Sequence, residues 1–120
     1  MAGTLTISTL SDGTNSTSAT NCIQGSTRAW GSFNGNAGVS AFTYYNVSSV
    51  TRNSTGVYTV AFTNAMANAN YTVVATAGSL TNTTKIATPN TPTTTNFKIE
   101  TLSTTWGTQD CYWTNFAVFA

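Results

Sequence analysis

Aromatic side chains beside predicted turns are the residues of this chain whose chemistry best suits ligand binding. Trp106 precedes a glycine in a polar stretch, Trp113 begins the last apolar run, and Tyr45 ends an earlier one. A flat aromatic ring can stack on a sugar while neighbouring Asn and Thr side chains hydrogen-bond the sugar hydroxyls. We therefore take Trp106, Trp113 and Tyr45 as candidate contacts to a receptor or glycan. Trp106 and Trp113 could instead lie in the core or at a subunit interface. For Trp30 and Tyr112 we favour that second interpretation.

Catalytic chemistry has few residues to draw on. The chain has no histidine, which excludes Ser-His-Asp and Cys-His arrangements within one chain and removes the usual general base. Its carboxylates are Asp12, Glu100 and Asp110, whereas glycoside hydrolysis needs two carboxylates flanking one bond. Asp12 stands in an Asp-Gly-Thr-Asn stretch that reads better as a turn than as a calcium loop. We predict no catalytic residue, no metal site and no cofactor.

Charge is scarce in this chain. Only 6% of the residues are charged and the net charge is +1. The four basic side chains are scattered, whereas nucleic-acid binding needs them clustered, so we expect no nucleic-acid partner. No apolar run is long enough to span a membrane and no signal peptide is visible, so we expect no membrane insertion. With 40% hydrophobic residues, the chain can bury a core.

The two cysteines, Cys22 and Cys111, stand far apart in the chain. They could form one disulfide or remain two buried or half-buried thiols, and their spacing does not decide between these. With no histidine beside them, they are too few for a structural zinc site.

The clearest strand pattern lies between residues 56 and 77. Two runs of large apolar residues alternate there with small or polar ones, separated by a stretch rich in Asn and Ala. The inward residues of the two runs are Tyr58, Val60 and Phe62, and then Tyr71, Val73 and Ala75. This period of two predicts strands with one face in a core. Because the stretch between them is short, we expect an antiparallel hairpin at the centre of the fold.

Further short strands are predicted along the chain, separated by turn residues. They cover residues 4–10, 28–33, 39–45, 47–52, 85–88, 97–102 and 112–119. Asn34-Gly35 predicts a hairpin turn, because both residues accept a positive φ. Asn46 predicts a kink between two strands, and Thr101 and Thr114 share the inward face of the last two strands.

No stretch shows a convincing helical period, and residues 11–21 have the composition of a loop. Short strands between turns predict an all-β protein, built as an antiparallel β-sandwich of jelly-roll-like form. We assign this sandwich to residues 28–120 and an extended N-terminal arm to residues 1–27.

Several motifs stand in a recognisable order between residues 28 and 71. They are Arg28-Ala29-Trp30, Phe33-Asn34-Gly35, Tyr45-Asn46-Val47-Ser48-Ser49-Val50-Thr51, Tyr58-Thr59-Val60, Phe62-Thr63, Ala65-Met66 and Ala69-Asn70-Tyr71. Together they resemble a β domain common in tailed bacteriophages, found at the C-terminal end of tail-fibre proteins or as a small separate virion protein. The resemblance covers residues 20–75 well and the rest loosely, and Ala67 departs from it where a proline is expected.

The resemblance implies a non-enzymatic virion structural protein and a homotrimer. The first expectation is a tail-fibre-like protein on the virion surface, assembled in the host cytoplasm, that contributes to host attachment through exposed loops and a host surface glycan. The N-terminal arm would join it to another virion protein. Two alternatives remain open: a capsid decoration or head-fibre protein, and a carbohydrate-binding module.

Overall fold

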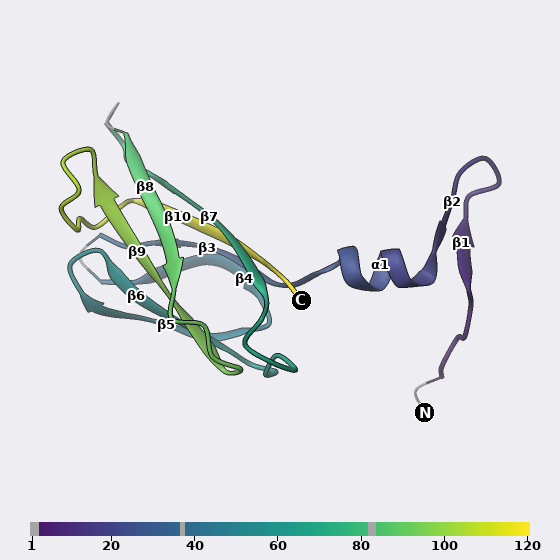
Figure 1. The fold of residues 1–120 in the computed structure, drawn as a ribbon. Helices are drawn as coiled ribbons and strands as arrows, with labels where there is room; N and C mark the ends of the chain where they lie inside the picture. Colours follow the sequence, from purple (N-terminus) through teal and green to yellow (C-terminus); the bar gives the residue numbers. More distant parts are fainter. Residues whose placement is uncertain (1–2, 37, 82–83) are drawn as a thin grey trace.

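The computed structural model describes residues 3–36, 38–81 and 84–120. Within these residues the chain forms ten strands and one short helix. Two four-stranded sheets make up its main body (Figure 1). The first sheet has the order β4-β3-β10-β7, with β3 at Thr27–Asn34, β4 at Ser40–Tyr45, β7 at Thr72–Gly78 and β10 at Trp113–Phe119. The second has the order β5-β6-β9-β8, with β5 at Val47–Ser54, β6 at Val57–Phe62, β8 at Lys85–Asn90 and β9 at Asn96–Ser103.

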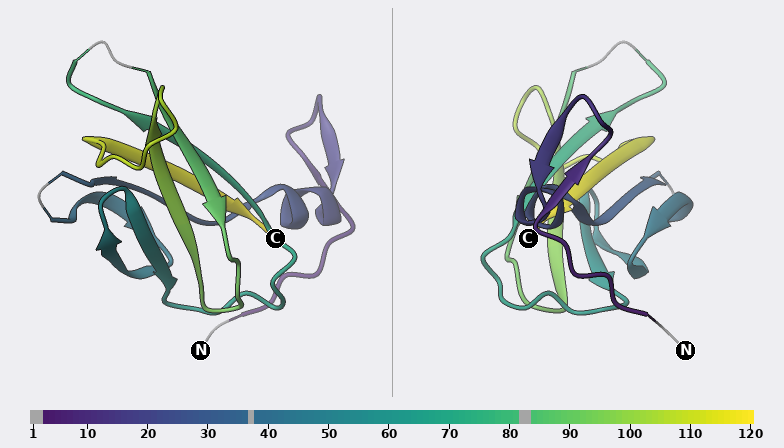
Figure 2. Two further views of the ribbon diagram at one scale, coloured as in Figure 1. Left: turned by 60° about the vertical axis from the view of Figure 1, so that its left-hand side comes forward. Right: turned by 90° about the vertical axis from the view of Figure 1, so that its right-hand side faces the viewer.

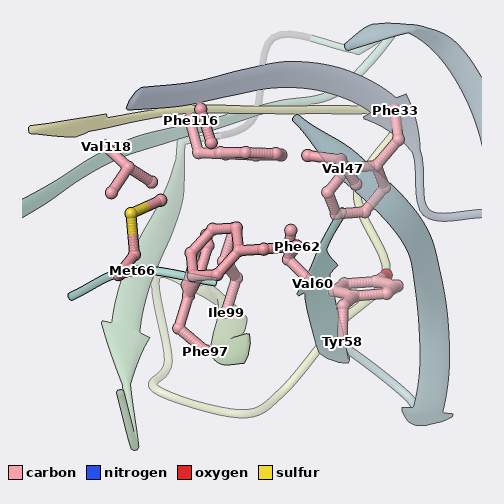
Figure 3. Packing of buried hydrophobic residues seen from close by; sticks show 11 residues of the cluster. Phe33, Val47, Tyr58, Val60, Phe62, Met66, Phe97, Ile99, Phe116 and Val118 are labelled. Carbon is pink, nitrogen blue, oxygen red and sulfur yellow. The ribbon is translucent and has the colours of Figure 1, made fainter. Parts of the chain in front are cut away.

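Neighbouring strands in both sheets pair antiparallel, which confirms the prediction of an all-β, antiparallel protein. The inward residues of the two sheets form one hydrophobic cluster, seen from close by in Figure 3. Each large apolar side chain buried in it contributes about 1.5–3 kcal/mol of hydrophobic stabilisation. The buried members are Ala29, Phe33, Val47, Tyr58, Val60, Phe62, Met66, Phe97, Ile99, Phe116 and Val118. The period-two patterns of β6, β9 and β10 therefore predicted the inward faces correctly.

The expected hairpin between residues 56 and 77 is wrong. β6 pairs with β5 and β9, whereas β7 lies in the other sheet and pairs with β10. The connection after β6 does not turn back on itself, because its backbone bonds to the turn before β9. The Phe62 amide donates to the Thr95 carbonyl and the Met66 amide to the Thr94 carbonyl, each at 2.8 Å. The chain thus crosses from one sheet to the other, with Met66 buried at the crossing.

Asn46 lies where the chain changes sheet for the first time, between β4 and β5. Its φ is 54°, a left-handed conformation that Asn tolerates better than most residues. Its side-chain amide donates to the carbonyls of Arg28 and Asn64, and its Oδ1 accepts from the Asn64 amide at 2.8 Å. The kink predicted at Asn46 is confirmed, and these bonds hold it in place.

Gly35 follows β3 in the β3–β4 hairpin that Asn34-Gly35 predicted, but for a different reason from the expected one. Its φ is not positive; among the described residues of this connection, a positive φ belongs to Gly38, at 116°. A Cβ on Gly35 would instead fall on the Tyr58 ring, 2.6 Å from Cζ and closer still to the hydroxyl. Close approach, rather than turn conformation, requires glycine here.

Residues 3–26 lie to one side of the two sheets in Figure 1 and in the left view of Figure 2. They form a small hairpin of β1, Thr9–Ser11, and β2, Ser16–Ser18, followed by the helix α1, Ala19–Gly25. This helix contradicts the expected loop. Its first turn is capped by the Ser18 side chain, which accepts from the Asn21 amide at 3.1 Å. Seven residues are too few for a periodic pattern to show.

Candidate functional site

A pocket of about 440 Å³ lies at the end of the sheets where β3, β7 and β9 finish. Because β8 and β10 run antiparallel to these strands, both begin at this end. The connections between the strands therefore meet around the pocket. Its lining comes from Asn36, Ser79, Leu80, Thr81, Thr84, Lys85, Ser103, Thr104, Gln109, Asp110 and Tyr112. This volume is in the range of ordinary ligand pockets, and the lining is mostly hydroxyl and amide groups.

Asp110 anchors the loop that forms one wall of this pocket. Its Oδ1 accepts hydrogen bonds from the Tyr58 hydroxyl at 2.7 Å and from the Gly56 amide at 2.8 Å. The Arg52 guanidinium donates to the same carboxylate, with Nη2 at 2.8 Å from Oδ2 and Nε at 3.1 Å from Oδ1. Asp110 thereby ties the loop after β9 to the β5–β6 hairpin.

The protonation of this cluster follows from the same contacts. Partial burial raises the pKa of Asp110, but the hydrogen bonds from Arg52, Gly56 and Tyr58 together outweigh it, so the net pKa lies below its ordinary value. Burial, and then the hydrogen bond to Asp110, raise the pKa of the Tyr58 hydroxyl. At neutral pH the carboxylate is ionised and the phenol is neutral, which suits a structural tie rather than an acid-base pair.

Gln109 holds a second contact in the same loop. Its amide donates to the Thr101 carbonyl at 2.9 Å, and its carbonyl accepts from the Thr101 hydroxyl at 2.6 Å. This two-way attachment to β9 fixes the backbone from which the Gln109 side chain extends. The Lys85 ammonium donates to Gln109 Oε1, which places a cation in the wall of the pocket.

Trp106 projects from a tight turn beside the pocket. The Trp106 amide donates to the Ser103 carbonyl at 3.0 Å, and the Ser103 amide donates to the Gly107 carbonyl at 2.9 Å. The indole is 72% exposed, and the residue has a φ of 63°, which is strained for a bulky side chain. Trp106 does not line the pocket itself, whereas Ser103 and Thr104 of the same turn do.

Trp113 lies at the same end, at the start of β10. Its indole is 41% exposed and packs edge-on against Tyr112, with ring centroids 4.8 Å apart. Tyr112 lines the pocket and is half-buried, so it does not belong to the core cluster. Trp106 and Trp113 are therefore brought to one end of the molecule as exposed aromatic rings.

Tyr45 lies at the opposite end of the first sheet. It is the last residue of β4, is 57% exposed, and stacks on Trp30 with centroids 6.4 Å apart. Trp30 is itself 40% exposed and is not in the core cluster. The structure thus separates Tyr45 from the other two candidates and pairs it with a residue that we expected to be buried or at an interface.

Lys85, Gln109 and Asp110 were not predicted as site residues. The scarcity of charge was the available signal, because Lys85 and Asp110 are two of only seven charged side chains. Nothing in the sequence placed them at one end, since that depends on strand direction in the two sheets.

Other features of the described residues bear on the class of protein. No cluster of three or more His, Cys, Asp or Glu side chains that could hold a metal is found in the described ranges. Cys22 and Cys111 are free thiols, the first half-buried and the second buried. No helix in the described part of the chain is long and apolar enough to cross a membrane.

No protein-family model, curated protein or solved structure matches this chain. Fold and site define it as an all-β protein of two antiparallel sheets with a polar, aromatic-flanked pocket at one end.

Proposed function

We propose that this chain is a non-enzymatic bacteriophage virion protein of the tail-fibre-like kind, exposed on the virion surface, that contributes to host attachment by binding a surface glycan. One observation carries the proposal: a polar pocket lies at the end of the sheets where β3 finishes, and the exposed residues Trp106 and Trp113 stand close in the chain to residues that line it. The motif resemblance to phage β domains supports the virion context. Assembly in the host cytoplasm follows from that context.

The geometry of β3 supports a protein that is anchored at its N-terminal segment and binds a ligand at the pocket. The N-terminal segment joins β3 at Thr27, and β3 ends at Asn34 beside the pocket. The strand from Thr27 to Asn34 separates the two ends by about 23 Å. A protein anchored by residues 1–27 would present its pocket outward.

The chemistry of the pocket suits a sugar. Hydroxyl and amide side chains can exchange hydrogen bonds with several sugar hydroxyls, and an exposed indole can cover the apolar face of a pyranose ring. Trp106 and Trp113 are the proposed stacking residues. We withdraw Tyr45 from this site, because it lies at the other end of the sheet.

The finer points of architecture belong to the same proposal. We propose that the two sheets form a jelly-roll-like sandwich, that residues 1–27 act as an arm binding another virion protein, and that three copies associate. β4 supports the association, since all six of its residues are exposed and it is an edge strand without charge or proline. Its exposed aromatic residues are Phe42, Tyr44 and Tyr45. Light scattering that gives a monomer mass would refute the trimer.

Glycan-array binding tests the attachment role. The wild-type protein should bind a subset of bacterial surface glycans, and Trp106→Ala and Trp113→Ala should weaken that binding about tenfold or more. Val74→Ala is the control, because it removes exposed apolar surface on β7, away from both the pocket lining and β4. Absence of binding by the intact oligomer, or equal losses in all three variants, would contradict the proposal.

A head-fibre or capsid decoration protein is the second candidate. The N-terminal segment favours it, because Leu5, Leu10 and Ile23 are more than half exposed there and suit packing against another virion protein. Imaging virions with labelled protein separates the two positions, since label on the icosahedral head would exclude a fibre tip. A carbohydrate-binding module that is not part of a virion would still bind the glycan, but its label would appear neither on the head nor at a fibre tip.

A further inference from the structure

The pocket contains two charged side chains, Lys85 and Asp110, and only one of them is already neutralised. Asp110 forms an ion pair with Arg52, and its Oδ1 also accepts from the Tyr58 hydroxyl and the Gly56 amide. Among the described residues, this is the one ion pair within 4.0 Å. The negative charge in the pocket wall is therefore matched by a cation, and its acceptor sites are occupied.

Lys85 has no such partner in the described part of the chain. Its ammonium donates to the neutral Gln109 Oε1, and an ammonium has three donors. Gln109 is held by its two backbone bonds to Thr101, so it fixes the direction of the Lys85 side chain without neutralising it. The pocket consequently presents one uncompensated positive charge.

Neutral polar groups surround that charge. Thr84, Ser103 and Thr104 contribute hydroxyls to the same lining, Asn36 an amide, and Leu80 an apolar contact. A ligand that matches this set carries one negative group with several hydroxyls beside it. A carboxylate next to ring hydroxyls, as in a uronic acid, has this arrangement, and charge-assisted hydrogen bonds to it are stronger than neutral ones.

We infer that the pocket binds a carboxylate-bearing sugar of the uronic-acid class, with Lys85 pairing with the carboxylate. This inference rests on the proposed glycan-binding function and adds the charge of the ligand to it. The hydroxyls of Ser103 and Thr104 bond the ring hydroxyls, and Trp106 covers the next sugar along the chain.

Calorimetric titration with trigalacturonic acid and with its fully methyl-esterified form tests the inference, because esterification removes the negative charges and adds only one methyl group to each carboxyl. The wild-type protein should bind the acid at least about tenfold more tightly than the ester at low salt. The preference should shrink in 0.5 M NaCl, because salt screens the attraction at this partly open site. Lys85→Gln should weaken binding of the acid to about the affinity of the ester and so remove the preference, and Lys85→Arg should retain it.

Lys98→Gln is the control for a general loss of positive charge. Lys98 lies on β9, next to the strand that carries Lys85, and does not line the pocket. This variant should bind both ligands as the wild type does, and thermal unfolding of all three variants should confirm that they fold.

The remaining outcomes each overturn a different statement. Equal binding of acid and ester by the wild type would overturn the charge preference and leave glycan binding intact. Binding of neither ligand by the wild type would overturn the uronic-acid inference, and the glycan array then decides the proposed function separately. Full competition by inorganic phosphate at the same concentration, with no ester binding, would show a general anion site and overturn the sugar class.

Discussion

The Tyr58 hydroxyl donates to Asp110 Oδ1 at 2.7 Å, and this bond joins the buried core to the loop that forms the pocket wall. Tyr58 is fully buried on β6, whereas Asp110 lies just before β10 in the loop. Any change at Asp110 should therefore affect both stability and the shape of the pocket.

Asp110→Asn should lower the free energy of unfolding by about 2–4 kcal/mol, because it leaves Arg52 without its carboxylate and weakens the bonds to Tyr58 and Gly56. Urea denaturation at pH 7 measures this change. Asp12→Asn is the matched control in the exposed β1–β2 turn, and it should leave the unfolding midpoint of the main body unchanged. A similar midpoint for both variants would contradict the anchoring role.

Acid should destabilise the protein through the same residue. The pKa of Asp110 lies below its ordinary value in the folded state, so its contribution is present above about pH 4 and is lost as the pH falls through the folded pKa. Urea midpoints measured between pH 7 and pH 2 should fall in this window for the wild type. The urea midpoint should fall less steeply with pH in Asp110→Asn than in the wild type. An equally steep fall in the variant would show that other groups cause the acid sensitivity.

Thr101 and Thr114 are both fully buried, and substitution by valine should affect them in opposite directions. The Thr101 hydroxyl donates to Gln109, so Thr101→Val should cost about 1–2 kcal/mol. The Thr114 hydroxyl has no hydrogen-bond partner among the residues that the structure describes, so Thr114→Val should stabilise the protein by about 1 kcal/mol. Thermal unfolding of the two variants side by side tests this, and shifts of the same sign would refute it.

Gly35→Ala should destabilise the protein by about 1–3 kcal/mol, because the new Cβ would lie 2.6 Å from Cζ of the fully buried Tyr58 ring and 3.0 Å from the Cys111 carbonyl oxygen. Gly25→Ala provides a comparison, since a Cβ there meets nothing within 4 Å. Urea denaturation should separate the two, and an unfolding midpoint for Gly35→Ala at the wild-type value would show that the Tyr58 contact can relax.

Trp106→Gly should be more stable than Trp106→Ala by about 1 kcal/mol, because glycine adopts the φ of 63° without the clash of a Cβ. Both variants should lose glycan binding, since both remove the indole. Urea denaturation and the glycan array together measure the pair. Equal stability of the two variants would show that the turn carries no backbone strain.

The strand faces could be read from the sequence because alternation is a local property. Tyr58, Val60 and Phe62 face the core as predicted, and so do Phe97, Ile99, Phe116 and Val118. The kink at Asn46 was also predicted, since Asn tolerates the positive φ through its own backbone. The β3–β4 hairpin was predicted as well, although Gly35 is required there by its close approach to Tyr58 and not by its φ.

Sheet membership was decided only by the tertiary structure. A strand with one inward face looks the same in either sheet, so the pattern between residues 56 and 77 could not show that β6 and β7 part. The placement of β6 and β7 in different sheets depends on backbone hydrogen bonds from Phe62 and Met66 to residues about thirty positions further along the chain. The sequence did not predict α1 either, because a single helix of seven residues rests on a local cap.

For the candidate site too, the sequence predicted one part and the tertiary structure decided the other. The aromatic residues and their polar neighbours were visible in the sequence, and Trp106 and Trp113 do lie exposed at one end. The direction of β8, β9 and β10 brought Lys85 and Asp110 to that end and left Tyr45 at the other. Composition and alternation thus determined a sparsely charged all-β protein rich in aromatic residues. The non-local pairing of strands decided which side chains share a pocket, because residues far apart in the chain meet only after the sheets form.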